Sequence, residues 1–321
     1  MGFRKRVYLC PSEIPFFIIR PPQISPLNRL YLYLFAALVL FSACEKAVSF
    51  TLDKADAKLV VDASIENGQP PRVVLTHSLD YFSRINADIL ARSFVHGAQI
   101  DVSNGSLTHR LKEYSVVTDA ATLYYYTVDS TNPATAFVGE MQKTYDLTVQ
   151  VGTETYTAKT TIPVLAKTIQ SLSWKKSEKN EDSLKVMVVA TVQDPPGLGN
   201  YIRYYTSVNK GPYYPGFTSV YDDQIVDGQT YEISVDQGVD RNTEVEYDNN
   251  FGLYNRGDTV VIKFANIDKA TYDFWRTMEY NYQSIGSPFS SPTKVEGNVS
   301  NNALGYFGGY ANQYISIIIP K

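Results

Sequence analysis

The stretch YDLTVQVGTETYTAKTTI, residues 145–162, alternates inward and outward side chains on both sides of a Gly-Thr pair. The inward set is Tyr145, Leu147, Val149 and Val151 before the pair, and Tyr156, Ala158, Thr160 and Ile162 after it. A period of two indicates half-buried strands, and Gly152-Thr153 supplies the turn between them. The stretch therefore predicts a β-hairpin, which Pro163 ends.

Further strand-like segments occur before and after this hairpin in the sequence. Strands are predicted at residues 58–65, 97–102, 185–192, 201–208, 230–235, 259–264 and 314–319. Short strands at this spacing must pair face to face to bury one side, so the first part of the chain is predicted to be an immunoglobulin-like or prealbumin-like sandwich. Residues 79–94 break the alternation and are expected to be an ordered loop or a short helix.

Beyond the hairpin, residues 164–171 are interpreted as a connector to a second β unit. In that unit, the prolines and glycines of Asp194-Pro-Pro-Gly-Leu-Gly-Asn200 predict a rigid turn. Residues 268–282 instead place apolar side chains at helical spacing, with Asp268 as the N-cap. Two domains are predicted: a β-sandwich over 44–165, and a sandwich-like β domain over 166–321 with one amphipathic helix near 268–284.

The amino-terminal region predicts export rather than a membrane span. The apolar run Leu30–Phe41 has twelve residues, fewer than the roughly 20 of a spanning helix but typical of a signal-peptide core. Arg29 precedes the run, and Ser42-Ala43 stands directly before Cys44. This pattern indicates a lipoprotein signal, so Cys44 is the predicted lipidation site; an ordinary secretory signal is the alternative. Residues 1–43 are excluded from the fold as signal peptide and upstream segment.

Cysteine content and charge narrow the possible functions further. The chain has two cysteines, and Cys10 lies before the predicted cleavage point, so no thiol remains for a disulfide or for nucleophilic catalysis. The formal net charge is −4, and removal of the basic amino-terminal segment makes the mature chain more acidic. Such a surface argues against nucleic-acid binding.

Residues that could carry catalysis or a metal do not form a recognisable motif. The three histidines, His77, His96 and His109, are too scattered for a zinc site. Acidic residues are plentiful at Asp222, Asp223, Asp236, Asp240, Glu244, Glu246 and Asp248. Paired acids could hydrolyse a glycoside or bind calcium, but we interpret this series as lining solvent-facing strand edges. The sequence thus predicts a protein that is not an enzyme, with no catalytic residue, metal or cofactor.

Tyrosine is the compositional outlier, with 25 in the chain. The loop Lys210-Gly-Pro-Tyr-Tyr-Pro-Gly216 combines stiff prolines with two aromatic rings that a turn cannot bury together. Aromatic rings with polar tips suit protein interfaces and sugar stacking. Tyr213 and Tyr214 are therefore the predicted contact residues for a ligand or a partner.

Several segments together resemble one known family. They are Cys44-Glu-Lys followed by Lys58-Leu-Val-Val-Asp-Ala-Ser-Ile, Tyr145-Asp-Leu-Thr-Val with Thr155-Tyr-Thr-Ala, Asp194-Pro-Pro-Gly with Asn200-Tyr-Ile-Arg, and Ala303-Leu-Gly-Tyr-Phe-Gly-Gly-Tyr310. With these landmarks the mature chain resembles domain of unknown function family 4249. The resemblance covers essentially the whole mature chain and carries over Cys44 alone as a functional residue.

The resemblance implies an envelope lipoprotein of a Gram-negative bacterium, held to the outer membrane by its lipid anchor. It also implies a TonB-dependent receptor as partner, with the lipoprotein as a non-enzymatic accessory subunit of nutrient uptake. The alternative is a surface lipoprotein that binds a glycan or a peptide. A hydrolase is the third hypothesis and requires two carboxylates about 5 to 10 Å apart across a cleft. An accessory subunit is expected to expose an aromatic patch, whereas a binding lipoprotein is expected to hold a concave site with tyrosines.

Overall fold

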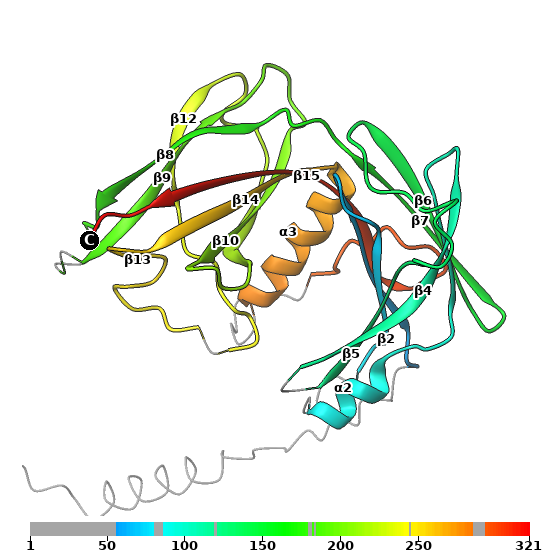
Figure 1. The fold of residues 1–321 in the computed structure, drawn as a ribbon. Coiled ribbons are helices and arrows are strands. Elements are labelled where there is room, and N and C mark those ends of the chain that lie inside the picture. The colour runs from blue at the N-terminus through cyan, green and yellow to red at the C-terminus, as the bar shows by residue number, and fades with distance from the viewer. Residues whose placement is uncertain are drawn as a thin grey trace, which may run out of the picture. The chain divides into compact units, whose positions relative to one another are not determined.

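The computed structural model describes residues 56–79, 86–118, 121–178, 182, 184–243, 245–284 and 293–321, all within one compact unit that spans residues 54–321. These residues contain fifteen strands and two helices (Figure 1). The prediction of a mainly β protein is therefore confirmed.

Strand bounds follow chain order. They are β1 (Leu59–Glu66), β2 (Arg72–His77), β3 (Gln99–Ser103), β4 (Thr108–Val117), β5 (Thr122–Val128), β6 (Lys143–Val151), β7 (Glu154–Ile162), β8 (Thr168–Lys176), β9 (Lys185–Gln193), β10 (Tyr201–Val208), β11 (Tyr214–Tyr221), β12 (Thr230–Val235), β13 (Tyr254–Asn255), β14 (Thr259–Ile267) and β15 (Leu304–Ile318). The helices are α2 (Ala87–Ser93) and α3 (Lys269–Ser284).

Among the described residues, eleven strands form one sheet in the order β11-β10-β14-β15-β1-β2-β5-β4-β3-β6-β7. Strand β15, with 15 residues, pairs with two different neighbours along its length. The amino-terminal part of β15 pairs in parallel with β1, from Val60 opposite Leu304 to Glu66 opposite Tyr310. Its remainder pairs antiparallel with β14. One sheet thus runs through both parts of the chain.

This sheet bears on the expected division into domains 44–165 and 166–321. The expected boundary falls between β7 and β8, where the chain leaves one sheet for the other. The eleven-stranded sheet nevertheless continues across it, because β15 was expected to span only 314–319 and instead reaches back to Leu304 and pairs with β1. The larger sheet therefore contains strands from both sides of residue 165, while β8, β9, β12 and β13 form a second sheet.

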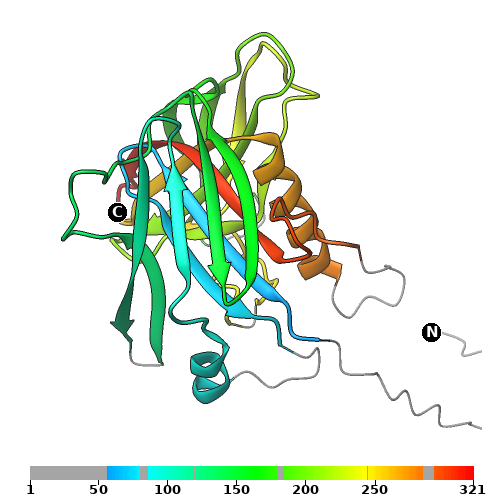
Figure 2. The ribbon, with the colours of Figure 1, turned by 90° about the vertical axis from the view of Figure 1, so that its right-hand side faces the viewer.

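One face of the large sheet, the core face, buries two apolar clusters. The first core contains Val61, Ala63 and Ile65 of β1 and Phe307 of β15, together with inward residues of β2 to β7. The β6–β7 hairpin folds back over β15 (Figure 2), where Gly309 lets the backbones meet. A Cβ at Gly309 would lie 2.6 Å from the carbonyl oxygen of Thr161. The sheet thus folds over, so that β7 packs against β15.

The second core lies at the other end of the same face. Here a separate sheet, with strand order β12-β9-β13 and β8 paired to β9, covers β10, β14 and the end of β15. Val186, Val188, Ala190 and Val192 of β9 point inward, as their alternation predicted. The second core therefore has a distinct covering layer.

The opposite face of the large sheet, the helix face, carries α3. Thr271 and Phe274 of α3 are buried, and Trp275 and Met278 pack against the same cluster as Ala265 and Tyr310 of the sheet. Asp268 caps the helix, because its Oδ1 accepts a hydrogen bond of 2.9 Å from the backbone N–H of Thr271. The predicted amphipathic helix and its cap are confirmed.

Local predictions succeeded where alternation is regular. Strands β1, β6, β7, β9, β10 and β12 lie where they were expected, within one or two residues. The connector is shorter than predicted, because β8 begins at Thr168. Strands β2, β4, β5 and β11 were not predicted, and the segment 79–94 contains α2.

Candidate functional site

The predicted lipidation site, Cys44, lies outside the described residues. Within the described residues, no helix is long and apolar enough to cross a membrane.

The predicted contact residues, Tyr213 and Tyr214, point to different surroundings. Tyr213 lies in the β10–β11 turn, is 43% exposed, and meets the exposed Tyr314 edge to face with ring centroids 6.1 Å apart. Tyr214 begins β11, and its hydroxyl donates a hydrogen bond of 3.1 Å to Oδ2 of Asp240. The turn therefore exposes Tyr213 beside Tyr314, whereas Tyr214 is bound to the loop between β12 and β13.

A concave feature of the described residues opens beside the second core. This cavity has a volume of about 650 Å³, within the roughly 300–1,000 Å³ of small-ligand sites. Its walls come from β8, β10, β11, β12, β14 and α3 and are mostly apolar. The apolar part of the lining consists of Ile169, Ile202, Tyr204, Val220, Ile225, Val226, Tyr231, Ile233, Val235, Ile262 and Phe264.

An irregularity in the edge strand opens this cavity. The pairing of β10 with β11 shifts between Arg203 and Tyr205, so residues 216–219 have no regular partner in the ladder. The displaced Ser219 is fully buried, and Glu279 of α3 accepts hydrogen bonds from both its backbone N–H and its hydroxyl. Arg241 pairs with the same carboxylate at 2.8 Å. The charge of Glu279, at the cavity wall, is thus fully engaged.

Residues 222–229, here called the rim loop, form part of the cavity wall between β11 and β12. Asp222, Ile225 and Val226 of this loop line the cavity. Ile225 is 90% exposed. The rim loop thus places an apolar side chain where the cavity meets solvent.

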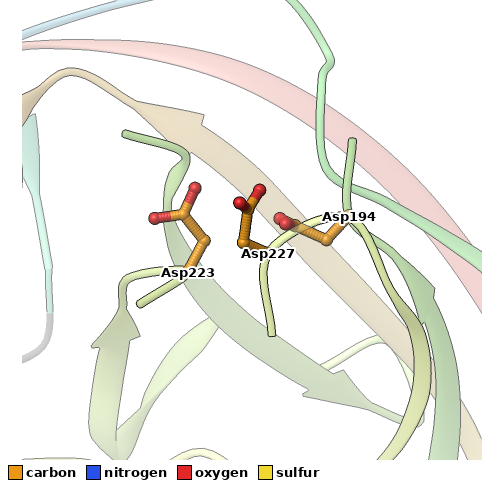
Figure 3. Close-up of side chains that lie close together, drawn as sticks. All are labelled: Asp194, Asp223 and Asp227. Atoms are coloured by element: carbon orange, nitrogen blue, oxygen red, sulfur yellow. The ribbon is translucent and has the colours of Figure 1, made fainter. Parts of the chain in front are cut away.

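Three aspartates hold the rim loop against the turn 194–200. Each of Asp194, Asp223 and Asp227 has a carboxylate oxygen within 4.8 Å of the others, and Figure 3 shows the three side chains side by side. Asp223 accepts hydrogen bonds from the backbone N–H groups of Gly199 and Asn200 at 3.1 and 2.9 Å. The rest of this aspartate cluster bonds in the same way, with Gly197 N–H donating to Asp227 and Gly228 N–H to Asp194.

A buried lysine completes the aspartate cluster. Lys167 Nζ lies 3.1 Å from Oδ1 of Asp194, and both side chains are almost wholly inaccessible to solvent. The two atoms are not aligned as a hydrogen bond, so their attraction is mainly Coulombic. Asn266 fixes the lysine backbone through two hydrogen bonds of 2.8 Å. Carboxylate groups of this kind could hold a divalent cation, but here Lys167 supplies positive charge, and each of the three carboxylates accepts at least one hydrogen bond from a backbone N–H group.

The aspartate cluster corrects one interpretation of the sequence. Asp223 was expected at a solvent-facing strand edge, yet it is 1% exposed. Burial raises the pKa of its carboxyl group, but the hydrogen bonds from Asn200 and Gly199 together lower the pKa by more than burial raises it. The pKa of Asp223 therefore lies below the usual value. Asp223 therefore stays ionised and acts as a fastener between two loops. In the sequence, Asp194-Pro-Pro-Gly197 and Asp227-Gly228 each indicate a turn. Nothing in the sequence indicates that these two turns contact each other.

Comparison with known families identifies the chain. The family described as Domain of unknown function (DUF4249) matches residues 45–315. The chain belongs to this family. The DUF4249 match begins directly after Cys44 and includes every strand around the cavity, so the resemblance seen in the sequence is confirmed. A search of curated proteins returned no match.

Proposed function

We propose that the protein is an outer-membrane-anchored lipoprotein that binds a small nutrient in its cavity, as a non-enzymatic accessory of a TonB-dependent receptor. The lipid anchor is proposed at Cys44 on the pattern of the signal segment, and the receptor as partner on the resemblance to envelope lipoproteins of the family. The observation that carries ligand binding is the cavity of about 650 Å³. A concave, mostly apolar site with a few polar groups is the usual form of a small-molecule site.

The chemistry around the cavity supports binding rather than catalysis. Glu279 is held by Ser219 and Arg241, and the aspartate cluster is held by backbone N–H groups and Lys167. Engaged carboxylates are poor proton donors and acceptors, because a general acid or base must reach the substrate. The apolar walls also suit a peptide better than a glycan, since sugar hydroxyls need many hydrogen-bonding partners.

Thermal shift of the detergent-solubilised lipoprotein tests ligand binding, with apolar dipeptides and maltooligosaccharides as probes. A ligand that binds the native state raises the melting temperature, and the shift grows with the ratio of ligand concentration to Kd. The variant Ile233→Trp places an indole in the cavity and is expected to abolish the shift. Ile318→Trp is the control, because Ile318 is 73% exposed and lies outside the cavity lining. Ligand shifts of equal size in both variants would place the ligand elsewhere.

A second candidate function is docking on the receptor without a ligand. It is favoured by the exposed aromatic pair of Tyr213 and Tyr314, because exposed aromatic rings commonly anchor interfaces. The test is a pull-down of the tagged lipoprotein from solubilised outer membranes, with Tyr213→Ala/Tyr314→Ala in parallel. Tyr247→Ala is the control, since Tyr247 is 64% exposed but lies elsewhere. Recovery of the receptor by both the double variant and the control would contradict this docking surface.

We further propose that the two cores are the interiors of two β-sandwich-like units, the first immunoglobulin-like or prealbumin-like, with their boundary near residue 165. The first core has strands on both sides, because β7 lies over β15. The second core lies between β9 and the pair β10 and β14. An experimental structure tests this arrangement: the expected result is two facing layers around each core, and a single open layer would contradict it.

A further inference from the structure

The cavity has one free charge of each sign in its lining. Asp222 begins the rim loop, and its Oδ2 accepts a hydrogen bond of 3.2 Å from the hydroxyl of Tyr272. Arg276 of α3 is exposed, and its guanidinium carbon lies 5.8 Å from the ring centroid of Tyr272. Asp222 and Arg276 form no ion pair with each other or with another described residue. They flank Tyr272 as separate, opposite charges.

Tyr272 fixes the position of the negative charge. Burial raises the pKa of its hydroxyl, and the Asp222 carboxylate raises it further, so the tyrosine remains a hydrogen-bond donor at neutral pH. Its ring stacks on Tyr201 with centroids 4.7 Å apart, which limits its motion. Asp222 therefore keeps one oxygen on Tyr272 and has its other oxygen without a described partner.

The third charge of the lining, Glu279, is already neutralised. Ser219 donates to it twice, and Arg241 pairs with it. A ligand therefore meets Asp222 and Arg276 as the available charges, beside walls that include Ile202, Phe264 and Val235.

We propose that the ligand is a zwitterion with an apolar body: an apolar α-amino acid or a short apolar peptide with both termini free. This inference rests on the proposed function of the cavity. The ammonium group of the ligand binds Asp222, its carboxylate binds Arg276, and its side chain enters the apolar cavity. A fatty acid would use Arg276 and leave the Asp222 carboxylate beside apolar chain, which is unfavourable. An apolar amine would use Asp222 alone and gain nothing from Arg276.

Isothermal titration calorimetry of the solubilised lipoprotein tests the assignment with Leu-Phe, N-acetyl-Leu-Phe and Leu-Phe-amide as probes. A hydrogen bond to a charged group is worth about 10- to 100-fold in affinity. Each blocked peptide is therefore expected to bind the unmodified protein about 10- to 100-fold more weakly than Leu-Phe.

Two variants that remove a charge assign each terminus to its residue. Asp222→Asn is expected to bind Leu-Phe and N-acetyl-Leu-Phe equally, because the ammonium partner is gone. Arg276→Gln is expected to bind Leu-Phe and Leu-Phe-amide equally. Lys269→Gln is the control on the same helix, because Lys269 pairs with Asp273 and does not line the cavity; it is expected to behave as the unmodified protein.

The remaining outcomes separate this inference from the proposed function. Equal binding of all three peptides to the unmodified protein overturns the zwitterion and leaves the cavity as the site, provided Ile233→Trp abolishes binding. Palmitate that binds through Arg276 alone, while the peptides do not bind, overturns the zwitterion in favour of a fatty acid. If no peptide, palmitate or oligosaccharide binds, both the inference and the proposed function fail.

Discussion

The two cores share one sheet face but are closed in different ways. The first core is closed by the sheet itself, which curls until β7 meets β15 at Gly309. The second core is closed by a separate layer of β8, β9, β12 and β13, and beside that layer a cavity of about 650 Å³ remains.

The difference shows where this fold leaves room for a ligand. A continuous curled sheet brings backbone against backbone and leaves little space. A separate layer is joined through loops, so its distance from the sheet depends on fasteners such as the aspartate cluster and Lys167. The cavity lies at that joint, where the edge strand is irregular and the rim loop is held by polar contacts.

The largest expected effect comes from truncating one phenylalanine in each core and comparing the losses in unfolding free energy. Phe307 in the first core is fully buried, and Phe264 in the second is 2% exposed but lines the cavity. Phe307→Ala is expected to lower the free energy of unfolding by about 3–5 kcal/mol. Phe264→Ala is expected to cost less than about 3 kcal/mol, because the space left by the ring joins the neighbouring cavity, into which surrounding side chains can relax. Denaturant unfolding measures both, and equal losses would contradict the contrast between the cores.

Removal of the buried lysine tests the fasteners of the second layer. Lys167→Ala leaves Asp194 buried and unpaired beside two other carboxylates, and breaking such a pair costs roughly 3–5 kcal/mol. We expect about 3 kcal/mol, the lower end, because the backbone N–H of Gly228 still donates a hydrogen bond to Asp194. Lys175→Ala is the control: Lys175 pairs with Glu232 on the surface, and the loss should stay below about 1 kcal/mol. Chemical denaturation gives both values.

The helix cap tests the link between the helix face and the first core. Asp268 caps α3, and its Oδ2 also accepts hydrogen bonds from Thr160 and Thr161 of β7. Asp268→Ala is expected to cost about 1–2 kcal/mol in unfolding free energy. Asp268→Asn should cost less, since asparagine is also a good N-cap. Equal unfolding midpoints for Asp268→Ala and the unmodified protein would show that the cap is not needed.

The two regions should also respond to acid over different pH ranges. In the first, His109 of β4 is fully buried beside the core, and its Nε2 accepts a hydrogen bond of 2.9 Å from the backbone N–H of Asp129. Burial lowers the pKa of His109 below the usual 6.5. The unfolded chain therefore takes up the proton first, and stability should begin to fall as pH drops through 6.5. His109→Gln should remove this part of the pH dependence in unfolding experiments.

In the second region, the rim loop should loosen only in stronger acid. The pKa of Asp223 lies below its usual 3.8, so its contribution is complete above that pH and is lost as pH falls through the lower, native pKa. Hydrogen exchange of the amides of Gly199 and Asn200 should report the loss, with Asp223→Asn showing fast exchange already at pH 7. Protection of these amides that is the same at pH 2.5 and pH 7 would contradict the role of Asp223.

Sequence periodicity predicted the elements whose pattern is local. The hairpin of β6 and β7, strand β1 and helix α3 each carry their own apolar period, and Asp268 marked the helix start. Strand β4 was missed because its outer half, Tyr114–Val117, is exposed on both faces and does not alternate. Strand β11 was missed because it begins within the proline-rich loop of Tyr213 and Tyr214.

The arrangement of these elements was not accessible in the same way. The parallel pairing of β1 with β15 joins distant parts of the chain, and nothing in either strand's pattern specifies that partner. The cavity draws its lining from six elements and the rim loop, so no short motif marks it. The aspartate cluster likewise joins the turn 194–200 to the rim loop. The sequence predicts a turn at 194–200, but it does not indicate that this turn contacts the rim loop. Tyr213 was found through composition, while Arg276 appeared in the sequence only as one charge on an amphipathic helix.

The pairing of β1 with β15 also sets the order in which the chain can fold. The backbone N–H of Asn312 bonds to the side chain of Asn67, 245 residues earlier, and the first core takes Phe307 and Ala311 from the same late strand. Pairing over such a separation is slow, because a long loop must close before its contacts form. The strands of the first core thus cannot complete that core until β15 is available. A product that lacks this final strand would leave one edge of β1 unpaired and the first core without Phe307 and Ala311.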